Sequence, residues 1–385
     1  MIKTLTKSRA LVIGFTLGMA AALPASATWS VIITDSATGE VAIGSATCVP
    51  FVDLKREAGV VRVGRGAGAA QSFVEPTGRN RGIIFDELAN GTDPATILDI
   101  LEAQDSGHET RQYGIADTEG RAVGFSGSSN GAFANDVSGT SGTLAYAVQG
   151  NVITGQPVLD EAVAALLLPA DLPTRLMRAM IAARDQGGDG RCSCSPFDAD
   201  GCGAPPPDFD KSADVGYMLV ARVGDEDGAC NSNAGCASGD YYMDLNVAFA
   251  SPNDPDPVDT LLGDFQAFRQ SKIGVPDHYR TLQILTNAQV PADGSSITRL
   301  VLVARDLNGA RITSGGASVS VNIDPSSDGD ATVLPVVDRG NGIYIAPLIA
   351  GESAGDVRLR VTIDDGTGAV ELAPQQVLEL VPAAR

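Results

Sequence analysis

Residues 28–49, TWSVIITDSATGEVAIGSATCV, predict the first two strands of the fold. Both halves of the stretch are rich in β-branched residues, and residues 36–39 (SATG) separate them as a turn, so we expect a buried β-hairpin. If the chain is cut just before Thr28, no turn or tail precedes the first strand. The position of that cut therefore decides which chemistry the hairpin can carry.

A secretion leader precedes the hairpin. Three basic residues lie within the first nine positions, residues 10–23 form an apolar run, and residues 25–27 (ASA) are the small residues that a signal peptidase recognises. The apolar run is shorter than the ~20 residues of a membrane-spanning helix. We therefore expect removal of residues 1–27, no membrane insertion afterwards, and an exported protein that begins at Thr28.

Charge and length limit the classes of partner. The 385 residues include 27 basic and 47 acidic side chains, a net charge of −20, which becomes −23 when the leader and its three basic residues are removed. Long-range repulsion then opposes binding to nucleic acid or to an anionic membrane surface. The length is sufficient for two or three domains.

The order of predicted elements indicates an α+β fold from residue 28 to about residue 272. Strands, paired helices, strands and a last helix follow one another, which suits two sheets between helical layers, because strands and helices alternate singly in a doubly wound parallel sheet. We expect helices over 81–90, 93–104, 157–168, 171–185 and 256–268, a second hairpin over 112–127, and strands over 143–149, 214–223 and 241–250.

The C-terminal part has a different pattern. After a linker over residues 273–282, short alternating strands without a helix signal predict a small all-β sandwich over 283–385. Residues 336–366, VVDRGNGIYIAPLIAGESAGDVRLRVTIDDG, resemble bacterial immunoglobulin-like repeats of the invasin and intimin type. This resemblance implies a spacer or adhesive module with a cell-surface or extracellular partner.

Six cysteines are unevenly distributed. Cys48 is isolated, and the other five lie in two irregular insertions at about 187–212 and 224–240. In an exported protein these five indicate local disulfides, first of all Cys230–Cys236. Zinc binding by the cysteines, or calcium binding by the aspartates of the insertions, is the alternative. Because the paired Cys-x-x-Cys spacing and a complete EF-hand loop are both absent, we expect stapled loops, no metal and no cofactor. The aspartates concerned are Asp198, Asp200, Asp225 and Asp227.

The histidine count argues against an ordinary hydrolytic triad. The chain has two histidines, His108 and His278, and both lie in segments that we predict to be solvated loops. A nucleophile needs a base within hydrogen-bond reach, and an N-terminal threonine provides both, because its α-amino group, with a pKa near ~7.7–8, can take the proton of its own hydroxyl. Thr28 is therefore a candidate nucleophile, although threonine is also an ordinary strand former.

Five blocks of the sequence resemble, in order, the uncharacterised family known as domain of unknown function 1028, which is assigned to the N-terminal nucleophile (Ntn) hydrolase superfamily. The resemblance runs over roughly residues 28–270. It implies a four-layer αββα sandwich with the N-terminal residue at the end of a central strand. The blocks are TWSVIITDSATGEVAIGSATCVP, GAAQSFVEPTGRNRG, AYAVQGNVITG, ARDQGGDG and YMDLNVAFASPNDPDPVDTL.

The resemblance assigns catalytic roles. The N-terminal threonine of the family falls on Thr28, and its V-Q-G-N block falls on residues 148–151. Asn151, with the backbone amide of Gly150 or Asn151, would stabilise the oxyanion of a tetrahedral intermediate, although Gly-Asn is also a common turn. Ser45 lies on the strand expected to pair with that of Thr28 and could position the amine or a water.

Three further residues are candidates for substrate binding. Gln71 lies in the family's T-Q block, Arg81 matches its P-R-G block and could bind a substrate carboxylate, and Asp189 ends the G-G-D block. Asp189 could instead cap a loop. A lysine like that near the nucleophile of proteasome-like members has no clear equivalent, and Lys55 is a candidate only by its position in the sequence.

These patterns favour an exported amidohydrolase, in the periplasm or outside the cell, that cleaves a small amide or a peptide through an acyl-enzyme. The alternative is a non-catalytic exported binding or adhesion protein on the same scaffold.

Overall fold

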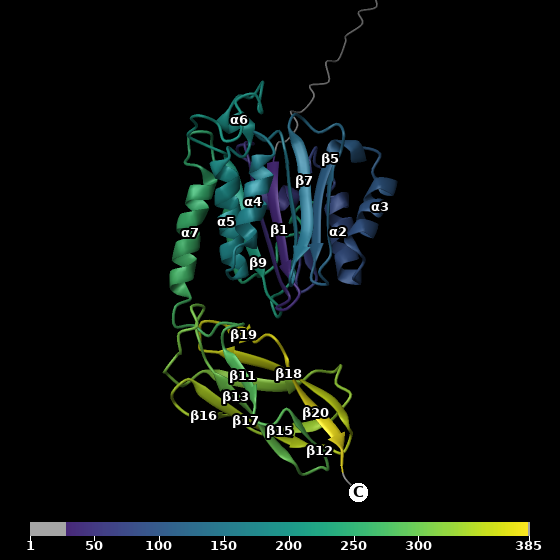
Figure 1. Ribbon diagram of the computed structural model, residues 1–385, viewed down its shortest axis with the longest axis vertical. Helices are drawn as coiled ribbons and strands as arrows, with labels where there is room; N and C mark the ends of the chain where they lie inside the picture. The colour runs from purple at the N-terminus through teal and green to yellow at the C-terminus, as the bar shows by residue number, and fades with distance from the viewer. Residues whose placement is uncertain (1–27, 384–385) are drawn as a thin grey trace, which may run out of the picture.

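The strand that begins at Thr28 lies inside a six-stranded antiparallel sheet in the computed structural model, which describes residues 28–383 (Figure 1). The predicted leader, residues 1–27, lies outside the described residues. The strand order is β10-β9-β2-β1-β8-β7, with β1 at Thr28–Asp35, β2 at Glu40–Thr47, β7 at Ala134–Ser141, β8 at Leu144–Asn151, β9 at Val215–Ala221 and β10 at Met243–Val247.

A second, four-stranded sheet faces the first. Its order is β3-β4-β5-β6, with β3 at Gly59–Arg62, β4 at Gly66–Ser72, β5 at Arg111–Asp117 and β6 at Ala122–Ser126. Ile32 of β1 and Ile43 of β2 pack against Ala67 and Ala69 of β4 in one buried cluster. The two sheets therefore share an apolar core between them.

Helices cover the outer faces of both sheets (Figure 1). On the six-stranded sheet, Val31 and Ile33 pack with Leu159 and Leu176. On the four-stranded sheet, Ile84 and Ile97 pack with Tyr113 and Ile115. The first group consists of α4 (Pro157–Leu167), α5 (Leu172–Asp185) and α7 (Pro257–Ser271), and the second of α2 (Arg79–Asn90) and α3 (Pro94–Gln104). Short helical segments also occur as α1 (Leu54–Ala58), η1 (His108–Thr110) and α6 (Gly190–Ser193).

The C-terminal part is a β-sandwich of two five-stranded sheets. Inward-facing residues alternate with exposed ones along its strands, and side chains such as Leu302, Leu348 and Leu359 fill its core. One sheet contains β11 (Leu282–Leu285), β13 (Ile297–Val303), β15 (Ala331–Val333), β16 (Val337–Asp338) and β17 (Ile343–Ala350), and the other β12 (Gln289–Ala292), β14 (Ser318–Ile323), β18 (Gly355–Asp364), β19 (Ala369–Glu371) and β20 (Gln376–Pro382).

An ion-pair cluster joins the sandwich to the N-terminal region. Arg222, at the end of β9, donates from Nε to Glu40 at 2.7 Å and from Nη2 to Asp277 at 3.3 Å. His278 is only 1% exposed, and its Nδ1 lies 3.1 Å from the backbone oxygen of Glu371. The expectation of a solvated His278 was therefore wrong, because residues 276–278 of the segment between the two parts of the chain are buried at their junction.

Two cavities of about 510 and 290 Å³ flank this junction. Arg222 and Asp277 line both cavities, so the ion-pair cluster separates them. No helix within residues 28–383 is long and apolar enough to cross a membrane.

Candidate active site at the start of β1

Thr28 lies between two polar residues in the sheet. Its backbone is paired with Asn151 of β8 on one side, and continuing the β1–β2 register by one residue places Thr47 on the other side. Side chains alternate between the two faces of a strand. Ser30 and Thr34 donate hydrogen bonds to the second sheet, at Gln71 and Asp117, so Thr28 faces that sheet as well.

A buried amide network supports Thr28 from the second sheet. Gln71 Nε2 on β4 donates to the backbone oxygen of Thr28 and to Gln112 Oε1, both at 2.8 Å. Asn151 Nδ2 donates to the same Gln112 oxygen at 2.9 Å, and Gln112 Nε2 donates to the backbone oxygen of Gly150 at 2.8 Å. Gln112 therefore fixes the orientation of both Gln71 and Asn151.

Ser45, a predicted site residue, contacts β1 one and two residues after Thr28. Its Oγ lies 2.7 Å from Ser30 Oγ and donates to the backbone oxygen of Trp29 at 2.9 Å. Ser30 in turn donates to Gln71 Oε1 at 2.5 Å. Ser45 thus contacts Ser30 and the backbone of Trp29, and it is linked to Gln71 through Ser30.

Several buried polar atoms near Thr28 have no hydrogen-bond partner among the described residues. They are Ser72 Oγ, Gln149 Oε1 and Asn151 Oδ1. Gln149 lies against Gly114, where a Cβ would come within 2.1 Å of Gln149 Oε1, so only glycine leaves room for this side chain. Unpartnered buried polar atoms are uncommon in folded proteins, and a catalytic role or a bound water is among their ordinary explanations.

Backbone strain is concentrated at the same end of the sheets. Within residues 28–383, four residues other than glycine have a positive φ: Ser72 (70°), Val152 (52°), Phe51 (63°) and Phe249 (58°). Ser72 ends β4 and Val152 follows Asn151, while Phe51 and Phe249 follow β2 and β10 at the ends nearest Thr28. Bulky residues rarely adopt this conformation, and strained backbone clusters at functional sites.

Asp189 lies beside the end of β2. Its Oδ2 accepts a hydrogen bond from the backbone amide of Cys48 at 2.6 Å, and its carboxylate pairs with Arg191 at 2.8 Å. Arg191 Nη2 lies 3.5 Å from Thr47 Oγ1. Asp189 also caps α6 by accepting from the backbone amide of Arg191 at 3.1 Å. The Asp189 carboxylate therefore lies at Cys48, the residue after Thr47, and it also caps α6.

Arg81 and Lys55 do not join this group. Arg81 is buried in the first turn of α2, donates to the backbone oxygen of Glu57, and has its pKa lowered by burial. Lys55 Nζ pairs with Asp244 at 2.6 Å. The described partners of both side chains, Glu57 and Asp244, lie outside the amide network around Thr28.

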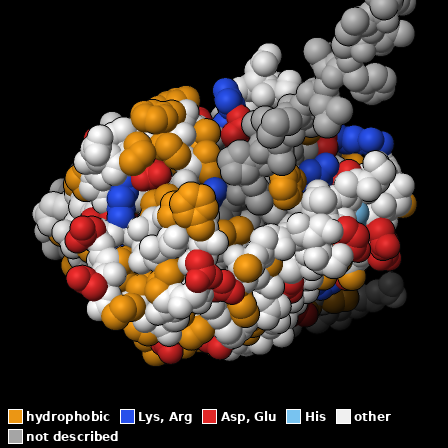
Figure 2. All heavy atoms as spheres, turned by 90° about the horizontal axis from the view of Figure 1, so that it is seen from above, with side chains coloured by type: hydrophobic (Ala, Val, Ile, Leu, Met, Phe, Trp, Pro, Cys, Tyr) orange, Lys and Arg blue, Asp and Glu red, His pale blue; other side chains and the backbone are white. Residues whose placement is uncertain are grey.

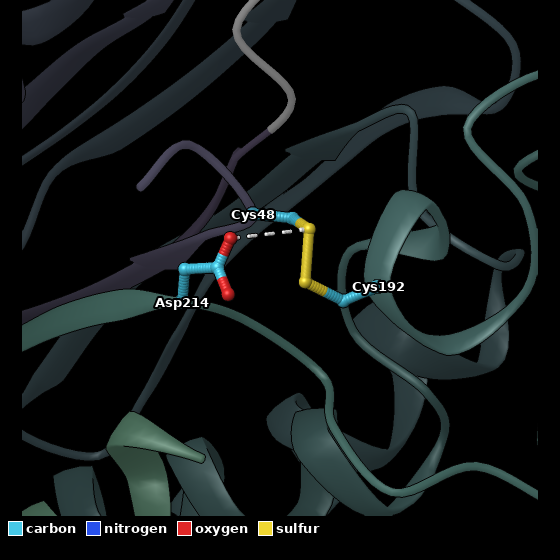
Figure 3. A group of neighbouring side chains, drawn as sticks. All are labelled: Cys48, Cys192 and Asp214. Atoms are coloured by element: carbon cyan, nitrogen blue, oxygen red, sulfur yellow. Dashed lines mark hydrogen bonds between the residues drawn. A yellow bond between two sulfur atoms is a disulfide. The ribbon is translucent and has the colours of Figure 1, made fainter. Parts of the chain in front are cut away.

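A disulfide adjoins the site (Figure 3). Cys48, directly after β2, is bonded to Cys192 of α6, and Oδ2 of Asp214 lies 3.6 Å from Cys48 Sγ. The prediction that the other five cysteines form local disulfides was wrong for Cys192, because the chain returns to the end of β2 after 144 residues. Cys230–Cys236 is confirmed, and the remaining bond joins Cys194 to Cys202.

The cysteines considered for zinc, and two of the aspartates considered for calcium, make other contacts in the structure. All six cysteines are in disulfides, whereas zinc is bound by thiolates. In the second insertion, Asp225 Oδ2 accepts from the backbone amides of Arg222 and Tyr242, and Asp227 Oδ1 accepts from that of Val63. These two carboxylates therefore hold loops together.

His108 is also buried, contrary to the prediction of a solvated loop. Its ring packs against Phe125, with 4.1 Å between the ring centroids, and against Tyr113 at 5.7 Å. The short η1 turn directs the side chain inward onto the second sheet.

Sequence reasoning missed Gln112 and Asp136. Gln112 lies in the predicted second hairpin, but a glutamine at a strand position usually indicates an exposed face. Asp136, on β7, accepts a hydrogen bond from Ser126 at 2.8 Å, and burial raises the pKa of its carboxyl although this hydrogen bond lowers it. Asp136 is paired with Gln149 in the sheet, so it belongs to the polar layer between the sheets.

Two family models match the chain. Residues 28–197 match the family of unknown function DUF1028, and residues 280–378 match domain 3 of invasin. The first match begins at Thr28 and is shorter than the resemblance over residues 28–270 that the sequence predicts. No curated protein matches the chain. Together with the three disulfides, the invasin-type domain indicates an exported protein.

The chain is also similar to solved structures. A DUF1028 protein from Silicibacter pomeroyi is 20% identical, with a TM-score of 0.46, over 63% of this chain and 86% of that one. The adhesin InvE of Yersinia pseudotuberculosis is 24% identical, with a TM-score of 0.22, over 27% of each chain. Invasin, a bacterial integrin-binding protein, is 12% identical, with a TM-score of 0.23, over 93% of this chain and 54% of that one.

Proposed function

We propose that the protein is an exported N-terminal-threonine amidohydrolase with an αββα scaffold of the Ntn type. The observation that carries this proposal is the position of Thr28, which opens a central strand, faces the second sheet and is paired with Asn151. The DUF1028 match begins at the same residue. The strained residues at the neighbouring strand ends support a functional site at this place.

The proposed reaction uses Thr28 alone as nucleophile and base. After removal of residues 1–27, its α-amino group accepts the Oγ proton while Oγ bonds to the carbonyl carbon of an amide. Collapse of the tetrahedral intermediate breaks the carbon–nitrogen bond, and the ammonium group returns the proton to the leaving amine. Water, deprotonated by the same amine, then cleaves the acyl-enzyme ester and restores Thr28.

Asn151 is the proposed oxyanion donor. One hydrogen of its Nδ2 is directed to Gln112, and the second hydrogen of the amide can bind the developing negative charge. Gly150, whose carbonyl accepts from Gln112, holds that glutamine in place and could add its backbone amide. Gln71 orients the backbone of Thr28, and Asp189 positions Arg191 for contact with a substrate.

A threonine-reactive β-lactone tests this proposal on the mature protein. We expect labelling of wild type, weaker labelling of Thr28→Ser, and none of Thr28→Ala. Thr34→Val is the matched control, because Thr34 lies on the same face of β1 and its hydroxyl donates to Asp117 of the second sheet. Equal labelling of Thr28→Ala and wild type would refute the proposal.

The invasin-type domain supports a second role, attachment of the enzyme to a cell-surface or extracellular partner. This role does not need the reaction, so attachment of the full mature chain to cell envelopes should be the same for Thr28→Ala and wild type. A protein with attachment but no labelling at Thr28 would be the non-catalytic adhesion protein.

A further inference from the structure

Two exposed phenylalanines lie on neighbouring loops at the end of the N-terminal region that contains Thr28. Phe51 is 62% exposed and Phe249 is 61% exposed. Their loops are joined by two backbone hydrogen bonds of 2.9 Å, from the amide of Phe51 to Ala250 and from the amide of Phe249 to Val52. Both residues have a positive φ, which is a genuine outlier for a bulky side chain.

The two loops are firmly anchored. Val52 and Ala250 pack against the apolar core between the sheets, whereas the neighbouring phenylalanine rings remain exposed. Asn246 Nδ2 donates to Asp53 at 3.1 Å, and Lys211 Nζ donates to the backbone oxygen of Ser251 at 3.3 Å. The exposure of the rings is therefore a fixed feature of the fold and not the result of a loose loop.

The sheet register places this pair near Thr28. Val247, two residues before Phe249, pairs with Gly216, which pairs with Ala46, the neighbour of Trp29. Three strand spacings of ~4.8 Å separate Val247 from β1, roughly 14 Å in all. Val52 and Ala250 pack on the core that contains Ile32, on the face to which Thr28 points. Figure 2 looks onto this end, where hydrophobic side chains lie on the surface among charged ones.

We propose that Phe51 and Phe249 bind an apolar group of the substrate, roughly 10–15 Å from the carbonyl that Thr28 attacks. This inference rests on the function proposed above. It names the substrate class: amides with an extended apolar substituent, such as an acyl chain or the aromatic side chain of a peptide, in preference to small polar amides. A function in substrate binding would explain why a strained backbone holds both rings on the surface.

Three β-lactone probes with one reactive group test the proposal on the full mature chain. Their side chains are a decyl chain, a phenylalanyl peptide and a short methoxymethyl group. We expect the two apolar probes to label Thr28 faster than the short probe. Phe51→Asn with Phe249→Asn should slow one or both apolar probes about tenfold, equivalent to about 1.4 kcal/mol, and leave the short probe unchanged.

Asparagine tolerates a positive φ, so these variants preserve the backbone of the loops. Phe51→Leu with Phe249→Leu should retain most of the apolar preference, and Tyr279→Ala, an exposed aromatic residue at the junction with the sandwich, should retain all of it. The faster of the two apolar probes distinguishes an acyl chain from a peptide. Equal rates for all probes, unaffected by the asparagine variants, would overturn the inference while the proposed function stands. Absence of labelling by any probe would overturn the proposed function itself.

Discussion

Thr28 and Asn151 are direct partners on neighbouring strands, although they are 123 positions apart in the sequence. Gln112 couples them from the opposite sheet, because its side-chain oxygen accepts from Asn151 and from Gln71, which also binds the backbone of Thr28. Three strands of two sheets thus determine the position of one threonine.

Gln112→Leu should destabilise the fold. The substitution leaves the buried amides of Gln71 and Asn151 without their shared acceptor, so we expect a loss of about 2–4 kcal/mol in the free energy of unfolding, measured with urea. Gln266→Leu, on the exposed face of α7, is the control and should change it by less than about 0.5 kcal/mol. Equal effects of both substitutions would show that the network does not stabilise the fold.

Replacing Cys48 and Cys192 together with serine should have a larger effect than replacing Cys230 and Cys236. The first bond spans 144 residues and the second spans six, which corresponds to about 5 and about 2 kcal/mol of chain entropy. Thermal unfolding compares the two double variants. The variant without Cys48–Cys192 should also react more slowly with the β-lactone at Thr28, because the disulfide that holds Asp189 and Arg191 beside β2 is lost. A greater loss of stability in the variant without Cys230–Cys236 would contradict this expectation.

Val152→Gly should stabilise the protein. Relief of the positive φ at Val152 is worth on the order of 1–3 kcal/mol, and the flexibility of glycine offsets part of it, so we expect a net gain of about 1 kcal/mol. Val152→Ala removes the same methyl groups but keeps the strain, and should show no gain. Urea midpoints give the comparison, and an equal loss in both variants would mean that no strain is stored there.

His278 should make stability fall as the pH is lowered. Burial, together with the positive charge of Arg222, lowers the pKa of His278 below its ordinary value near 6.5. As the pH is lowered, His278 therefore binds a proton in the unfolded state before it does so in the folded state. Its contribution to the free energy of unfolding is complete above about pH 6.5 and is lost as the pH falls through the folded-state pKa. Urea unfolding at pH 7 and pH 5 should show a smaller difference for His278→Gln than for wild type, and an unchanged difference would exclude this role.

Periodicity predicted the local elements well. The first hairpin, the amphipathic helices and the strands of the C-terminal sandwich follow from alternating or helical apolar patterns. Strand β7 (Ala134–Ser141) was missed because its sequence, ANDVSGTS, is polar and lies at the edge of the sheet.

The candidate site depends on long-range register, which periodicity does not contain. Gln112 and Ser30 are buried polar residues at strand positions, where sequence patterns predict exposure. Arg81, a candidate for substrate binding, instead donates to the backbone oxygen of Glu57 on α1. The predicted cleavage site indicated Thr28, the family resemblance added Gln71 and Asn151, and the structure adds the residues that hold them together.

Mass-spectrometric sequencing of the N-terminal peptide, after β-lactone treatment of the exported protein, shows whether Thr28 is an N-terminal nucleophile. We expect a mature chain that begins at Thr28 with a single adduct on its Oγ. A mature chain that begins at another residue, or an adduct on any residue other than Thr28, would refute this role.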